Sequence, residues 1–180
     1  MPFTVDDLLA LPDDGYRYEL FDGSLLVSPA PAVLHQRVVG QLLYVLGSAA
    51  PPEMEPLPPV NVRVGDRDCY IPDVVVVPSA AVRSMALMVE PGQILLAVEV
   101  VSSCSRSRDR HLKTAAYAAA GIPAYWRVEV DEGPVLHVHE LDGDSYGTPT
   151  THRAGTPAAP AAPFPVSFDP AYLLEQRSNP

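Results

Sequence analysis

The chain has 180 residues, of which 47% are hydrophobic and 19% are charged, so it is long enough for one domain with a full hydrophobic core. Its formal net charge of −10 argues against a protein that coats nucleic acid by general electrostatic attraction, because such binding needs many cationic contacts. No apolar run approaches the roughly 20 residues of a membrane-spanning helix, and the acidic N-terminus lacks the features of a signal peptide. We therefore expect a cytoplasmic protein.

The first part of the chain predicts a short helix, a hairpin and a longer helix. Thr4 is a typical N-cap for a helix through Leu11, and Asp22-Gly23 between apolar runs predicts a hairpin. From Val33 to Leu46 the apolar residues recur at helical spacing, and Gly47 is expected to end this helix. The proline-rich segment 49–59 predicts a loop.

Apolar strands dominate the middle of the chain. Val60–Val64 and Tyr70–Val77 are expected to be strands, and Pro72 inside the second indicates a bulge or an edge. A loosely helical loop is expected over 79–89. The next apolar strand, Ile94–Val101, contains one carboxylate, Glu99.

The last part of the chain predicts one more helix and two more strands. The helix begins near Ser105 or Ser107 and ends at Ala120, before Gly121 and Pro123. The strands cover 124–130 and 134–141, and a Pro/Ala-rich strap follows over about 155–180. The whole pattern predicts a mixed α/β fold: a single domain over 1–180 with its core over about 3–141.

Two acids accompany the predicted central strands. Asp73 stands just ahead of the apolar run 74–77, and Glu99 lies within the next long strand. Neighbouring strands can bring two such carboxylates into one coordination sphere, where hard oxygen ligands suit Mg²⁺ or Mn²⁺. The alternative is that each acid pairs with an arginine.

The position of Lys113 is also informative, because it is the only lysine among 12 basic side chains. Lysine offers a compact ammonium that arginine cannot replace. Asp109, Lys113 and Tyr117 are spaced i, i+4 and i+8 and so share one helical face. Lys113 can therefore point back toward Glu99; the alternative is a solvent-facing ion pair.

Other candidate residues give weaker signals. The two cysteines, Cys69 and Cys104, are expected to be free thiols. His137 and His139 alternate with apolar residues and are expected on the polar face of a strand, where a solvated face is favoured over a metal site. The chain has no Walker-type phosphate loop or glycine-rich dinucleotide motif.

Several short motifs, in this order and spacing, resemble the Uma family, a bacterial group described as "putative restriction endonucleases" within the PD-(D/E)xK nuclease superfamily. The resemblance covers roughly 3–141. The motifs are Tyr18-Glu19-Leu20-Phe21-Asp22-Gly23, Ser28-Pro29-Ala30-Pro31, His35-Gln36, Pro72-Asp73-Val74-Val75, Val98-Glu99-Val100 with Ser102, Asp109…Lys113…Tyr117, and Ala120-Gly121-Ile122-Pro123-Ala124-Tyr125-Trp126.

The resemblance implies a restriction-endonuclease-like core, a mixed sheet with flanking helices, and a homodimer. It implies that Asp73 and Glu99 bind a divalent metal, with the carbonyl of Val100 as a further ligand. The superfamily pattern has a lysine two residues after the glutamate, where this chain has Val101. The Uma pattern instead has its lysine on the following helix, which Lys113 matches. The residues implied at the border of the site are Glu19, His35, Ser102, Asp109 and Tyr117.

Two functional hypotheses follow. The first is a magnesium-dependent endonuclease that hydrolyses DNA phosphodiester bonds, with Asp73, Glu99 and Lys113 as its catalytic residues and Mn²⁺ as an alternative metal. The second is a non-catalytic member of the same fold that acts through binding or assembly. The acidic net charge and Val101 favour the second hypothesis somewhat.

Overall fold

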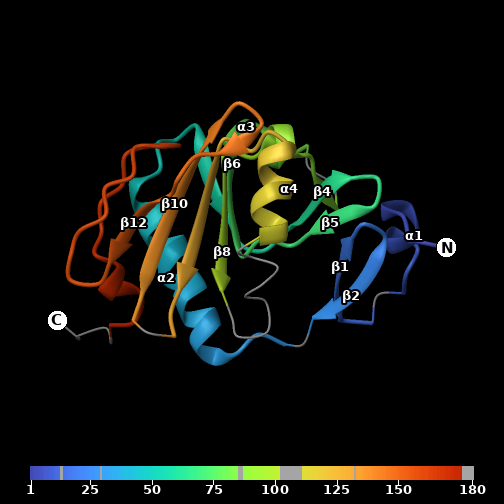
Figure 1. The fold of residues 1–180 in the computed structure, drawn as a ribbon, viewed down its shortest axis with the longest axis horizontal. Helices are drawn as coiled ribbons and strands as arrows, with labels where there is room; N and C mark the ends of the chain where they lie inside the picture. Colours follow the sequence, from blue (N-terminus) through green and yellow to red (C-terminus); the bar gives the residue numbers. More distant parts are fainter. Residues whose placement is uncertain (13, 29, 85–86, 102–110, 132, 176–180) are drawn as a thin grey trace.

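The structure is a computed structural model and describes residues 1–12, 14–28, 30–84, 87–101, 111–131 and 133–175. The fold is mixed α/β, as the sequence predicts, but its strands form two mixed sheets where a single sheet was expected (Figure 1). The helices are α1 (Val5–Leu9), α2 (Val33–Ala49), α3 (Ser79–Val82) and α4 (Lys113–Ala119), with 3₁₀ turns η1 (Pro91–Gln93) and η3 (Pro170–Leu173).

The smaller sheet has five strands in the order β2-β1-β5-β4-β7. Only the β4–β7 pair is parallel. Its strands are β1 (Arg17–Phe21), β2 (Ser24–Ser28), β4 (Asn61–Gly65), β5 (Asp68–Tyr70) and β7 (Met88–Val89).

The larger sheet has the order β11-β10-β9-β8-β6-β3, and β12 also pairs with β10. Its central pair, β8 and β9, is parallel, and the other pairs are antiparallel. Its strands are β3 (Met54–Leu57), β6 (Val74–Pro78), β8 (Leu96–Val101), β9 (Ala124–Glu129), β10 (Val135–Asp142), β11 (Ser145–Tyr146) and β12 (Thr150–Arg153).

The β1–β2 hairpin confirms the predicted turn. Asp22 and Gly23 both have positive φ, 46° and 75°, and they connect Phe21 to its register partner Ser24. Positive φ at both central residues is the requirement of a type I′ turn, which matches the twist of the flanking strands. This hairpin carries Glu19 in its first strand.

The single strand expected over Tyr70–Val77 is wrong, because the structure divides it between the two sheets. Tyr70 ends β5 in the smaller sheet, and Val74 begins β6 in the larger one. Pro72 cannot donate to a strand ladder, and the backbone N–H of Asp73 donates to the carbonyl of Val98 at 2.9 Å. Residues 71–73 therefore cross from one sheet to the other, and Asp73 lies where they reach β8.

Two smaller expectations are also wrong. Gly47 does not end α2, which continues to Ala49 and stops before Pro51, a residue without an N–H. The proline-rich segment expected to be a loop contains β3, which pairs with β6. Because β3 lies at the edge of the sheet, Pro56 can occupy it without removing a central hydrogen bond.

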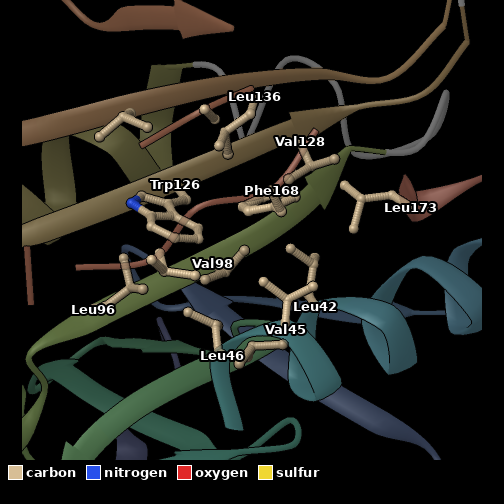
Figure 2. Packing of buried hydrophobic residues seen from close by; sticks show 14 of the residues in the cluster. Leu42, Val45, Leu46, Leu96, Val98, Trp126, Val128, Leu136, Phe168 and Leu173 are labelled. Atoms are coloured by element: carbon tan, nitrogen blue, oxygen red, sulfur yellow. The ribbon is translucent and has the colours of Figure 1, made fainter. Parts of the chain in front are cut away.

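The main core lies between α2 and one face of the larger sheet. Figure 2 shows Leu42, Val45 and Leu46 of the helix facing Val98 and Trp126 of the sheet. The described part of the C-terminal strap contributes to the same core, through the buried side chains of Ala158, Phe164, Val166, Phe168 and Leu173.

Replacing Leu42 by alanine is expected to lower the free energy of unfolding by about 2–5 kcal/mol, because the fully buried side chain leaves a cavity. Urea unfolding followed by the fluorescence of Trp126, the only tryptophan, measures this loss. Leu34→Ala on the same helix is the matched control, since Leu34 is 48% exposed and its replacement should cost about 0.5 kcal/mol or less. Equal losses in the two variants would contradict this assignment of the core.

A second core covers the opposite face of the larger sheet. It joins Tyr70 of the smaller sheet to Val75 and Tyr125 of the larger one, with Tyr117 of α4 among them. Ring contacts continue this packing, since Tyr117 lies edge-on to Tyr70 at 5.8 Å and tilted against Tyr125 at 5.5 Å. The two sheets and α4 therefore meet in one packed region, and the candidate site lies in it.

Candidate active site

Asp73 is held at the point where the chain enters the larger sheet. It is 6% exposed, and its Oδ2 accepts a hydrogen bond from the backbone N–H of Val100 at 2.8 Å. The Nε2 atom of His35, in the first turns of α2, lies 3.2 Å from the same oxygen. One carboxylate oxygen thus joins β8, α2 and the start of β6.

Glu99 lies in β8 and is 3% exposed. Side chains alternate along a strand, so Glu99 points away from Val98 and Val100, which belong to the core under α2. It faces α4, where its Oε1 accepts hydrogen bonds from Lys113 Nζ and from the hydroxyl of Tyr117, both at 2.8 Å. The carboxylate is therefore buried with a cation and a neutral donor.

Lys113 begins α4 and is 4% exposed. Its Nζ lies 2.8 Å from Glu99 Oε1 and 2.9 Å from Glu19 Oε1. The expected contact with Glu99 is present, and a solvent-facing ion pair is wrong for this residue. The i, i+4 spacing brings Tyr117 to the same carboxylate.

Two of the residues implied at the border of the site, Ser102 and Asp109, lie outside the described residues, as does the arginine cluster at 106–110.

Glu19 joins the site from the smaller sheet. Its Oε1 accepts the backbone N–H of Ile71 at 2.9 Å as well as the ammonium of Lys113. The resemblance placed Glu19 only at the border of the site, and its strand position gave no sign of these partners. The one available signal was the motif Tyr18-Glu19-Leu20-Phe21-Asp22-Gly23, through the family resemblance that it carries.

Among the residues that the structure describes, the acidic side chains of this region outnumber the basic ones. Glu19, Asp73 and Glu99 supply three carboxylates, whereas Lys113 supplies one ammonium and His35 an imidazole. The hydrogen bond to Asp73 raises the pKa of His35, against the opposing effect of burial. Burial, with the negative charge of Glu99, raises the pKa of Tyr117 well above its ordinary value, so its hydroxyl keeps its proton and donates.

The pair of His35 and Asp73 predicts a specific pH dependence of stability. A histidine pKa that is raised in the folded state stabilises the fold fully below the unfolded value of about 6.5, and this contribution is lost as the pH rises through the raised value. We expect wild-type protein to lose more thermal stability than His35→Gln between about pH 5 and pH 8. Parallel melting curves for the two proteins would contradict the pairing.

The donor atoms of the site fit a hard divalent cation. Among the residues that the structure describes, no group of three or more His, Cys, Asp or Glu side chains is arranged to hold a metal. Mg²⁺ is commonly bound through one or two carboxylates and keeps several waters, so it does not require such a group. Asp73 and Glu99 are both buried carboxylates at β8: Asp73 accepts the N–H of Val100, and Glu99 is the preceding residue of that strand. The carbonyl of Val100 is a hard oxygen donor of the same kind.

Other sequence candidates lie away from this site. The expectation for His139 is wrong: it is buried, stacks on Tyr125 at 5.3 Å, and burial lowers its pKa to about 4. His137 contacts the hydroxyl of Thr151 at 3.0 Å. Cys69 is a free, buried thiol whose pKa is raised to about 12 by burial, while Cys104 lies outside the described residues. None of the helices over the described ranges is long and apolar enough to cross a membrane.

Comparison with known proteins places this geometry in context. The fold is similar to a solved structure titled as "a putative nuclease belonging to DUF820 from Anabaena variabilis ATCC 29413", with a TM-score of 0.74. The two chains share 17% sequence identity, and the match covers 90% of each. At this identity the similarity shows the fold, and it confirms the nuclease-like core expected from the sequence. No curated protein matches the chain.

The family assignment comes from the sequence itself. Residues 5–173 match the Uma2 family, whose description is "Putative restriction endonuclease". The match spans both sheets and includes Glu19, Asp73, Glu99 and Lys113. The chain therefore belongs to the Uma2 family of restriction-endonuclease-like proteins.

Proposed function

We propose that this protein is a metal-dependent endonuclease that hydrolyses phosphodiester bonds in DNA. Family membership supports a nuclease, and one observation favours a working site. Lys113 Nζ lies 2.8 Å from Glu99 Oε1, although the strand position that carries the lysine in the wider superfamily is Val101. The cation that such a site needs would therefore come from α4 instead of β8.

Asp73 and Glu99 would hold Mg²⁺ or Mn²⁺, with the carbonyl of Val100 as a further ligand. The bound ion would stabilise negative charge at the scissile phosphate and lower the pKa of a water molecule. Asp73 is already oriented by the N–H of Val100, and Glu99 by Tyr117. Such orientation of the ligands by their neighbours is typical of metal sites.

Lys113 would act on the substrate and not on the metal. Its ammonium can donate a hydrogen bond to a phosphate oxygen that gains negative charge in the transition state, or orient the attacking water. Because Nζ already contacts two buried carboxylates, the end of the side chain is held at a fixed point. Little reorganisation is then needed at the moment of reaction.

The deciding experiment is a cleavage assay on supercoiled, linear and single-stranded DNA with Mg²⁺ or Mn²⁺. Wild-type protein should cleave at least one form, EDTA should stop the reaction, and Lys113→Ala should be far slower. Metal binding is measured separately by calorimetry with Mn²⁺. If folded wild-type protein cleaves none of these substrates, and Asp73→Ala binds Mn²⁺ as wild type does, the proposal fails and the non-catalytic hypothesis replaces it.

A further inference from the structure

We infer that Glu19 is a positioning residue that fixes Lys113 and Asp73 relative to each other. This inference rests on the proposed function, since those two residues are the ones it assigns to the chemistry. Glu19 itself would contact neither metal nor substrate. Its position in β1, on the smaller sheet, separates it in the fold from Glu99 on the larger sheet and from Asp73 at the end of the crossing between the two.

One oxygen atom of Glu19 carries both connections. Its Oε1 accepts from Lys113 Nζ and from the N–H of Ile71, both at 2.9 Å. Ile71 is the first residue after β5 and Pro72 has no N–H, so this hydrogen bond fixes the start of the crossing at 71–73. The N–H of Asp73 fixes its end by donating to Val98. Hydrogen bonds thus hold the crossing at both of its ends, at Ile71 and at Asp73. They limit how far Asp73 can move.

The surroundings of Glu19 make this arrangement rigid. Phe21, two residues along the same strand and therefore on the same face, stacks on Tyr70 at 4.7 Å. Tyr70 in turn lies against Tyr117, the residue that bonds Glu99. A packed row of rings therefore runs beside the carboxylate, and Glu19 is only 6% exposed. A buried carboxylate in such a place is stable only with donors around it, which Lys113 and Ile71 supply.

Charge and hydrogen bonding can be separated at this position. Glu19→Gln keeps an oxygen that can accept from the N–H of Ile71 but removes the negative charge that attracts Lys113. Glu19→Ala removes both interactions. Glu55→Gln is the matched control, because Glu55 is an exposed glutamate on β3. If the substitutions loosened the whole fold instead, Glu19→Gln and Glu19→Ala would both increase the reactivity of Lys113 and the hydrogen exchange of the Ile71 amide.

Lys113 can be followed directly because it is the only lysine of the chain. An amine-reactive reagent can modify Lys113 and the N-terminus alone, and the exposed Met1 amine serves as an internal reference in peptide mass spectrometry. We expect Glu19→Gln to increase modification of Lys113 several-fold while hydrogen exchange at the Ile71 amide stays slow. Glu19→Ala should increase both, and Glu55→Gln should change neither.

The functional readouts then distinguish positioning from metal binding. Glu19→Gln should bind Mn²⁺ as tightly as wild type does, while its single-turnover cleavage rate falls by roughly 100-fold, the effect of a small misplacement of a reacting group. Unchanged Lys113 modification would overturn the inference, and a loss of Mn²⁺ affinity equal to that of Asp73→Asn would make Glu19 a ligand instead. If wild type cleaves no DNA, the proposed function fails, whereas the modification and exchange data still decide whether Glu19 fixes Lys113.

Discussion

Replacing Lys113 by methionine is expected to slow DNA cleavage by roughly 100- to 1,000-fold, the usual effect of removing one donor that stabilises transition-state charge. The same change should lower the free energy of unfolding by about 3–5 kcal/mol, because it takes a buried cation away from the carboxylates of Glu19 and Glu99. Single-turnover assays measure the first effect and urea unfolding the second. Methionine keeps most of the length of the side chain, so the loss of charge dominates both results.

Arg83→Met is the matched control for this experiment, because Arg83 is an exposed cation at the end of α3. It should change the free energy of unfolding by no more than about 0.5 kcal/mol. If Lys113→Met cleaves DNA at the wild-type rate, the ammonium of Lys113 takes no part in the reaction. A loss of stability without a loss of rate would leave Lys113 with a structural role alone.

Replacing Asp73 by asparagine should abolish cleavage at ordinary metal concentrations and weaken Mn²⁺ binding by at least roughly 100-fold. Loss of an outer partner of a metal ligand already costs about 10- to 100-fold in affinity, and loss of the ligand's charge should cost at least as much. Asparagine retains a side-chain oxygen that can accept the N–H of Val100, so the backbone conformation at this position should not change. Calorimetry with Mn²⁺ and a cleavage assay over a range of metal concentrations measure the two effects.

The control for this substitution is Asp144→Asn, which changes an exposed acid in the turn after β10. It should leave both Mn²⁺ affinity and cleavage unchanged. Asp73→Asn protein that binds Mn²⁺ like wild type would rule out Asp73 as a ligand. High metal concentrations that restore cleavage would instead show that Asp73 contributes affinity and little else.

Features set by neighbouring residues could be predicted from the sequence. The turn at Asp22-Gly23 depends on two residues that tolerate positive φ, and both adopt it. The apolar spacing in α2 placed that helix, although its end was two residues beyond Gly47. The spacing of Lys113 and Tyr117 similarly placed both on the face that meets Glu99. In each case the deciding interaction lies within one element or one turn.

Features set by distant residues could not be predicted. Nothing local in 70–77 indicates that Tyr70 and Val74 belong to different sheets, because that depends on which strands they pair with. The contact between Glu19 and Lys113 joins residues far apart in the chain, and no periodic pattern in the sequence indicates it. His139 was expected on a polar face, but packing against Tyr125 and Tyr146 buries it. Tertiary packing decided all three.

Under the proposed function, the crossing at 71–73 has a consequence for how the protein would lose activity. The candidate site draws Glu19 from one sheet and Glu99 from the other, whereas Trp126 lies within the larger sheet and its core. Partial separation of the sheets would remove Glu19 from Lys113 without disturbing the surroundings of the tryptophan. Under mild denaturation, inactivation would then precede the change in fluorescence, and enzymatic competence would be the more sensitive measure of an intact fold.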